Sequence, residues 1–96
     1  MMQVYLLHFE KPLSHAQHYL GSTKNLPYRL SQHRNGEGSP LVKAVIEAGI
    51  LVHLAGTWEG GRDLERKFKR RKNGRKLCPI CQAEKRRERL FGKQIN

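Results

Sequence analysis

The fold of this chain is decided by residues 19–33, which read YLGSTKNLPYRLSQH. The segment begins as a short strand, turns at Gly21 and enters a helix behind Asn25. Asn is a favourable N-cap, and Pro27 is tolerated in the first turn because the backbone N–H that it lacks would have no intrahelical partner there. Residues 19–33 therefore predict a strand, a turn and a helix.

The same segment carries side chains that suit phosphate chemistry. Arg29 and His33 are four residues apart, so they lie one above the other on one face of the helix. Tyr19 stands just before the turn that leads into this helix. The segment thus gathers a phenol, a guanidinium and an imidazole, groups that a phosphodiester-cleaving site needs.

The flanking sequence extends this unit into a small α/β (α+β) fold, a three-stranded sheet flanked by helices with a basic C-terminal extension. Residues 3–9 (QVYLLHF) predict a strand that pairs, across a long loop, with a return strand over residues 17–21. Residues 50–57 (ILVHLAGT) are almost continuously apolar, which suits a central strand covered on both faces. Ser39 and Pro40 form a helix start. In the order β-β-α-α-β-α, the expected elements are residues 3–9, 17–21, 25–35, 40–47, 50–57 and 62–72.

The positive charge of the chain is concentrated in its C-terminal part. The net charge of the 96 residues is +11, yet residues 1–60 hold five Lys or Arg against four Asp or Glu, and residues 61–96 hold fourteen against four. This asymmetry predicts a polyanionic partner, most often nucleic acid and sometimes an anionic membrane surface. We expect a folded domain over residues 1–77, followed by a Cys-x-x-Cys turn and a basic tail over residues 78–96.

The sequence gives no sign of membrane insertion or export. No apolar run approaches the roughly 20 residues that a membrane-spanning helix needs. The N-terminal residues MMQVY lack the basic start and the small-residue cleavage site of a signal peptide. We therefore expect a cytoplasmic protein with no membrane partner.

One ordered set of residues resembles the motifs of the GIY-YIG nucleases over residues 3–72. In that family a tyrosine in a first strand is followed by a Tyr-x-Gly motif, then by an arginine and a histidine on a helix, and later by a helical glutamate. The positions that match here are Tyr5, Tyr19-x-Gly21, Arg29, His33 and Glu65. The resemblance implies a fold of the kind described above.

The resemblance also implies an activity, a divalent-metal-dependent endonuclease that hydrolyses phosphodiester bonds of DNA. In that mechanism Glu65 holds one Mg²⁺ or Mn²⁺ ion, and Tyr5 or Tyr19 helps to deprotonate water. Arg29 and His33 stabilise the phosphate.

Departures from the family pattern leave a second interpretation open. Gln3 stands where the family has Gly, and Leu77 stands where an Asn is common. The alternative is a nucleic-acid-binding module that keeps the fold without the chemistry. Glu65 also has a purely structural interpretation, because Glu65 and Lys69 form an i,i+4 pair worth only ~0.2–0.5 kcal/mol.

Lysines and arginines outside this set are interpreted as contacts to the nucleic-acid backbone, with a merely solvated surface as the alternative. A charge of this density supplies affinity for phosphates but carries no information about bases. The expected contact residues are Lys24, Lys69, Arg70, Arg71, Lys72, Arg75 and Lys76.

Cys78 and Cys81 form a Cys-x-x-Cys motif, which is half of a closed four-ligand zinc site. No second cysteine pair follows, and this favours a compact hydrophobic turn over residues 77–81 with two thiols. A Zn²⁺ site completed by a distant histidine or by a second chain, and a reversible disulfide, remain the alternatives. The histidines that could complete such a site lie far back in the sequence, at His8, His15, His18 and His53.

Overall fold

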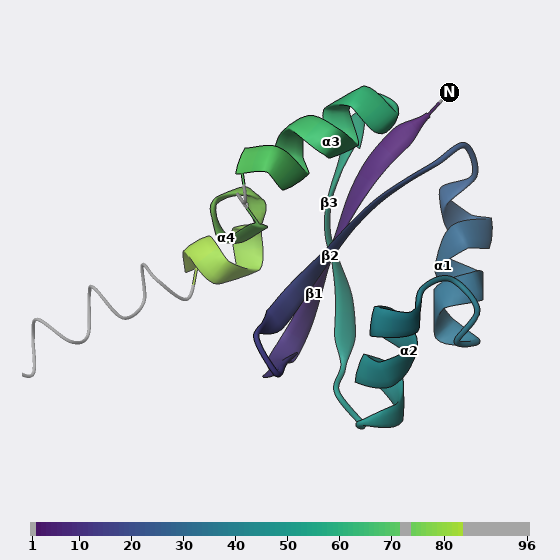
Figure 1. Ribbon diagram of the computed structural model, residues 1–96, viewed down its shortest axis with the longest axis vertical. Coiled ribbons are helices and arrows are strands. Elements are labelled where there is room, and N and C mark those ends of the chain that lie inside the picture. The colour runs from purple at the N-terminus through teal and green to yellow at the C-terminus, as the bar shows by residue number, and fades with distance from the viewer. Residues whose placement is uncertain (1, 72–73, 84–96) are drawn as a thin grey trace, which may run out of the picture.

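The chain folds into a three-stranded antiparallel sheet with helices on both sides (Figure 1). The computed structural model describes residues 2–71 and 74–83. The strand order is β2-β1-β3, and both neighbours of β1 run antiparallel to it. This confirms the predicted α/β class and the order β-β-α-α-β-α. The elements are β1 (Gln3–Leu13), β2 (Ala16–Thr23), α1 (Leu26–Arg34), α2 (Pro40–Glu47), β3 (Val52–Glu59), α3 (Arg62–Arg71) and α4 (Gly74–Leu77).

The hairpin of β1 and β2 is longer and tighter than the sequence predicts. A long loop was expected over residues 10–16, but β1 continues to Leu13, and Leu13 pairs with Ala16. Pro12 lies within this strand. It is accommodated because the register shifts between His8 and Leu13, and an irregular ladder tolerates a residue without a backbone N–H.

The central strand is β1, and the prediction of a central strand over residues 50–57 was wrong. β3 lies at an edge of the sheet, where Leu54 is 45% exposed, and Leu51, just before the strand, is 61% exposed. The continuously buried run is residues 4–9 of β1. Both segments are apolar, and an apolar run does not reveal which strand receives a neighbour on each side.

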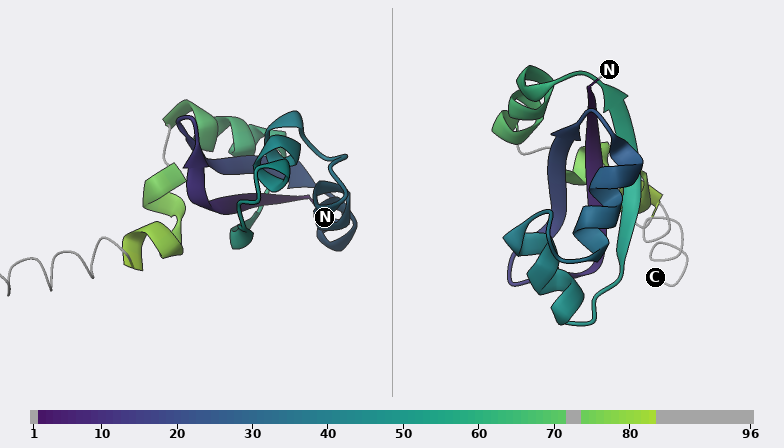
Figure 2. Two further views of the ribbon diagram at one scale, coloured as in Figure 1. Left: turned by 90° about the horizontal axis from the view of Figure 1, so that it is seen from below. Right: turned by 90° about the vertical axis from the view of Figure 1, so that its right-hand side faces the viewer.

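The two faces of the sheet have different covers (Figures 1 and 2). Alternate residues of β1, beginning at Tyr5, point toward α1 and α2 and form the core with Val42 and Val45 of α2. The residues between them, His8 included, point to the other face, where α3 and α4 lie. These faces are called the α1–α2 face and the α3–α4 face below.

The predicted helix starts are confirmed. Asn25 caps α1, and its Oδ1 accepts a hydrogen bond from the backbone N–H of Tyr28 at 3.2 Å. Ser39 occupies the N-cap position of α2 with Pro40 in the first turn, although its side chain makes no capping hydrogen bond. Gly49 follows α2 with a φ of 77°, a left-handed conformation that glycine adopts without strain.

The segment after α3 is more helical than the predicted compact turn over residues 77–81. α4 ends at Leu77, Cys78 separates it from the next helix, and that helix begins at Pro79 and continues to residue 83. Pro is favourable at a first helical position, so the Cys-Pro step starts a helix here.

Candidate functional site

Four of the predicted site residues meet on the α1–α2 face. Tyr5 comes from β1, Tyr19 from β2, and Arg29 and His33 from α1. The Tyr5 Oη lies 2.7 Å from His33 Nε2, and Arg29 Nε donates a hydrogen bond to the same Oη at 3.3 Å. The Tyr19 ring packs edge-on against the His33 ring, with their centroids 5.2 Å apart. These four residues are called the tyrosine cluster.

Two glycines make room for the buried members of the cluster. A Cβ atom on Gly21 would lie 2.6 Å from Tyr5 Oη, and a Cβ atom on Gly38 would lie 2.5 Å from His33 Nδ1. Both distances are too short for a side chain, so either substitution would displace a ring. Gly21 belongs to the recognised motif, whereas the sequence analysis missed the role of Gly38.

Burial sets the protonation of the two central groups. It raises the pKa of Tyr5 despite the hydrogen bond from Arg29, and it lowers the pKa of His33, with the Arg29 charge acting in the same direction. Both groups are therefore neutral at pH 7. Because the phenol oxygen already accepts from Arg29, we assign its single proton to the bond with His33 Nε2, which leaves the imidazole proton on Nδ1. That Nδ1 is buried and has no hydrogen-bond partner.

The accessible groups of the cluster are Tyr19 and Arg29. Tyr5 and His33 are 0% and 3% exposed, whereas Tyr19 and Arg29 are half-buried. Three bonds orient the guanidinium, since Nη1 donates to Gln32 Oε1 at 3.2 Å and Nη2 to the Gly38 carbonyl at 3.1 Å, in addition to the bond to Tyr5. Gln32 was missed by the sequence analysis, although its i,i+3 spacing from Arg29 is the signal that places the two side chains together.

Glu65 lies apart from the tyrosine cluster. It is on α3, across the sheet from α1, and its Oε2 is 3.1 Å from the Lys69 ammonium (Figure 1). Burial acts to raise the pKa of Glu65, but hydrogen bonds with Ser22 and Lys69 and the charges of Lys69 and Arg62 outweigh it, so the net pKa is lowered. The carboxylate is therefore ionised at neutral pH.

Glu65 fits a divalent-ion site of the simplest kind. Mg²⁺ is commonly held by one or two carboxylates together with substrate phosphates and waters. Glu65 offers one anionic, half-buried carboxylate beside the Ser22 hydroxyl. Within residues 2–71 and 74–83, no cluster of carboxylates is present that would make a fuller cage.

The predicted phosphate-contacting residues lie in several elements. Lys24 is exposed between β2 and α1, and Lys69, Arg70 and Lys76 are exposed on α3 and α4. Arg71 and Arg75 belong to α3 and α4. Lys72, Asn73 and the predicted basic tail from residue 84 onward lie outside the described residues. A hollow of about 490 Å³ on α3 is lined by Asp63, Arg66, Lys67 and Arg70.

A second polar cluster lies on the α3–α4 face. It consists of His8, His18, Cys78 and Cys81, which are called the His–Cys tetrad, and its four ligand atoms all lie within 4.8 Å of one another. Both cysteines are thiols. His8 and His18 are direct partners in the register of β1 and β2. This cluster has a donor set that can bind a metal ion. The arrangement matches the alternative of a site completed by distant histidines rather than the preferred plain turn with two thiols.

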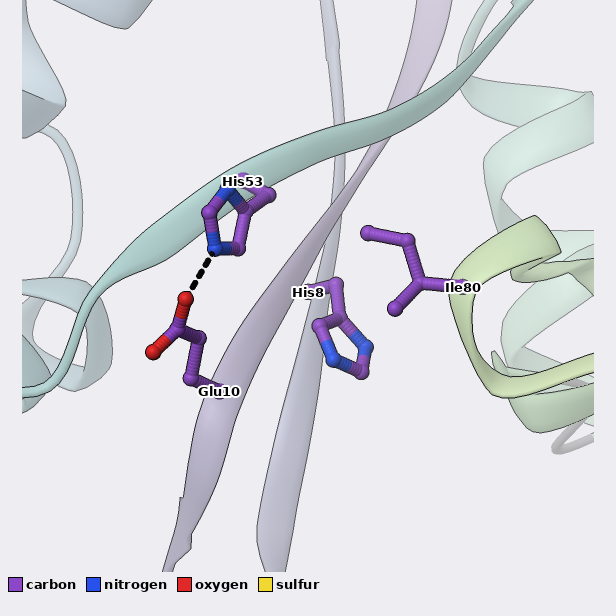
Figure 3. Close-up of a pocket in the computed structure, with 4 residues that line it drawn as sticks. All are labelled: His8, Glu10, His53 and Ile80. Atoms are coloured by element: carbon purple, nitrogen blue, oxygen red, sulfur yellow. Dashed lines mark hydrogen bonds and ion pairs between the residues drawn. The ribbon is translucent and has the colours of Figure 1, made fainter. Parts of the chain in front are cut away.

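The tetrad borders a pocket of about 460 Å³ lined by His8, Glu10, His53 and Ile80 (Figure 3). His53 Nε2 lies 2.8 Å from Glu10 Oε1 on one side, and Ile80 lies on the other side of His8. Since Ile80 stands between the two cysteines in sequence, the segment that carries the thiols also forms a wall of this pocket.

Comparison of this chain with family models, curated proteins and solved structures gives no match. Among the described residues, no helix is both long and apolar enough to span a membrane.

Proposed function

We propose that this protein is a GIY-YIG-type endonuclease that hydrolyses DNA phosphodiester bonds with the help of Mg²⁺ or Mn²⁺. The observation that carries the proposal is the tyrosine cluster, in which a phenol, a guanidinium and an imidazole from β1 and α1 are joined by direct contacts. A histidine and an arginine that merely decorated the surface of α1 would not converge on one buried phenol.

In the proposed mechanism Arg29 and Tyr19 touch the substrate. The Arg29 guanidinium is held in one plane by its three bonds, and a fixed fork donates to two phosphate oxygens as charge develops on them. Tyr19 is the more accessible phenol and orients the attacking water. The water oxygen bonds to phosphorus as the P–O ester bond breaks, the water loses a proton to solvent, and the leaving oxygen takes up a proton from solvent.

Tyr5 and His33 act behind these two groups. Tyr5 stays a neutral phenol, in contact with His33 Nε2 at 2.7 Å, and its Oη accepts the hydrogen bond from Arg29 Nε. Tyr5 and His33 are therefore positioning residues that orient the Arg29 guanidinium. When bound, a Mg²⁺ or Mn²⁺ ion on Glu65 supplies neutralisation of phosphate charge.

The second candidate is a nucleic-acid-binding module without the chemistry. The observation that favours it is the ion pair of Glu65 with Lys69 at 3.1 Å within α3, a helix that contributes no residue to the tyrosine cluster. In this alternative, α3 contributes charge to binding and Glu65 serves only as a helix partner.

The deciding experiment is a plasmid-nicking assay of the full chain with Mg²⁺ or Mn²⁺ added or omitted. Omission is preferable to a chelator, because a chelator would also remove an ion from the His–Cys tetrad. We expect Arg29→Lys to lower the nicking rate by about 10²-fold or more with little change in DNA binding, because lysine keeps the charge but lacks the fork.

Arg34→Lys is the matched control, since Arg34 is exposed on the same helix. DNA binding by the wild-type chain without metal-dependent nicking would support the binding module. Equal nicking rates for Arg29→Lys and the wild type would remove Arg29 from the mechanism.

A further inference from the structure

Four distances within the His–Cys tetrad match the edges of a tetrahedron around one ion. His8 Nδ1 and His18 Nε2 are 3.4 Å apart. Cys78 Sγ is 3.4 Å from His8 Nδ1, and Cys81 Sγ is 3.6 Å from His8 Nδ1 and 3.3 Å from His18 Nε2. A tetrahedral Zn²⁺ with bonds of about 2.0–2.1 Å to nitrogen and 2.3 Å to sulfur separates two nitrogens by about 3.4 Å and a nitrogen from a sulfur by about 3.6 Å.

We propose that His8, His18, Cys78 and Cys81 bind a structural Zn²⁺ ion. Two thiolates and two imidazoles in a tetrahedral array are the donors that select zinc over Mg²⁺ or Ca²⁺, which take oxygen ligands. Two thiolates also neutralise the charge of the ion. Four protein ligands leave no open position for a substrate, so this ion stabilises the fold and takes no part in hydrolysis.

Burial agrees with a closed site. Cys78 and His8 are 0% and 2% exposed, and His18 and Cys81 are half-buried. The imidazoles come from adjacent strands of the hairpin, whereas the thiols come from the segment after α4, 70 residues along the chain from His8. The ion therefore fastens the segment after α4, and with it the cationic α3–α4 region, to the sheet.

This inference is independent of the proposed nuclease activity. The tetrad lies on the α3–α4 face and the tyrosine cluster on the α1–α2 face. Loss of zinc from an active nuclease, or zinc in an inactive binding protein, would separate the two proposals.

The test is elemental analysis of the full chain purified under reducing conditions without chelator. We expect about one zinc per chain, and we expect Co²⁺ exchanged into the site to give the intense visible absorption of a tetrahedral thiolate complex. We also expect both thiols to react slowly with an alkylating reagent until a chelator is added. These three measurements use the wild-type chain, so they do not depend on whether a variant folds.

The matched variants are His18→Ala, Cys81→Ser and His15→Ala. His15 is an exposed histidine in the turn between the two ligating strands, so His15→Ala should retain zinc while the other two lose it. Metal-free protein that also fails to bind Co²⁺ would overturn the proposal. So would zinc retained by a Cys78→Ser/Cys81→Ser double variant, a Cys78–Cys81 disulfide in the reduced preparation, or stoichiometric iron or copper in place of zinc.

Discussion

The two faces of the sheet bury polar side chains in different ways. On the α1–α2 face, the tyrosine cluster is held by direct contacts and glycine clearances among residues 5–38, and it leaves Tyr19 and Arg29 accessible. On the α3–α4 face, the tetrad gathers four ligand atoms from positions as far as 73 residues apart. The first arrangement suits a ligand that arrives from outside, and the second suits an ion enclosed by the chain.

Glu65 gives the largest predicted effect, because it lies on the α3–α4 face and yet is proposed to act with the tyrosine cluster. We expect Glu65→Gln to abolish metal-dependent nicking, since a hard divalent ion needs the negative charge. Stability should change by only ~0.2–0.5 kcal/mol, the value of the pair with Lys69. DNA binding should persist or tighten, because one negative charge is removed.

The measurement is a paired gel-shift and nicking assay in Mn²⁺, with circular dichroism to verify folding. Glu47→Gln is the control, since Glu47 is an exposed acid on α2. A well-folded Glu65→Gln protein that nicks at the parental rate would exclude the metal role and make Asp63 or Glu59 the next candidate.

Gly21 tests the packing of the tyrosine cluster on the α1–α2 face. An added methyl group would lie 2.6 Å from Tyr5 Oη, so we expect Gly21→Ala to lower the free energy of unfolding by about 1–3 kcal/mol and to reduce nicking, with the zinc content unchanged. Urea denaturation measures the first effect. In Gly61→Ala the new Cβ would meet only Met2 at 3.9 Å, and a change of a few tenths of a kcal/mol is expected. Equal stability of the Gly21→Ala variant and the wild type would mean that the Tyr5 phenol does not depend on the space next to Gly21.

His33 gives the smallest predicted effect, a dependence of stability on pH. Its pKa is lowered in the folded state, so the unfolded chain binds more protons once the pH falls below the ordinary value of 6.5. Stability is therefore retained above pH 6.5 and lost as the pH falls toward the folded pKa, with a slope of at most about 1.4 kcal/mol per pH unit.

Urea denaturation between pH 7 and pH 5 measures this slope, and His33→Gln should reduce it. The two proteins differ only at residue 33, so the difference between the two slopes isolates His33. Identical slopes would show that His33 is protonated as easily in the fold as in the unfolded chain.

Sequence reasoning grouped Tyr19, Arg29 and His33 because they lie in one short segment, and the family resemblance added Tyr5. Arg29 and His33 are related by one helical turn, and the hairpin places Tyr5 opposite Gly21. Gln32 and Gly38, the partners that orient the guanidinium, were not predicted.

The position of β3 and the histidines of the tetrad could not be predicted in the same way. An apolar stretch indicates a strand but not its neighbours, so β3 was placed at the centre when it is at an edge. His8 pairs with His18 in the same register as Tyr5 with Gly21, but the sequence predicted a hairpin with a long loop and did not define its register. Four histidines were therefore possible partners of Cys78 and Cys81, and the sequence did not single out His8 and His18.

The difference in sequence separation between the two clusters also implies an order of folding. Closing a short loop costs less entropy than closing a long one, so contacts within residues 5–38 form early and the contacts of His8 with Cys78 and Cys81 form late. We expect the hairpin and α1 to assemble first, with both histidines already side by side on the sheet. Cys78 and Cys81 then join the two histidines and complete the tetrad. The α3–α4 region is the last part of the described fold to become fixed.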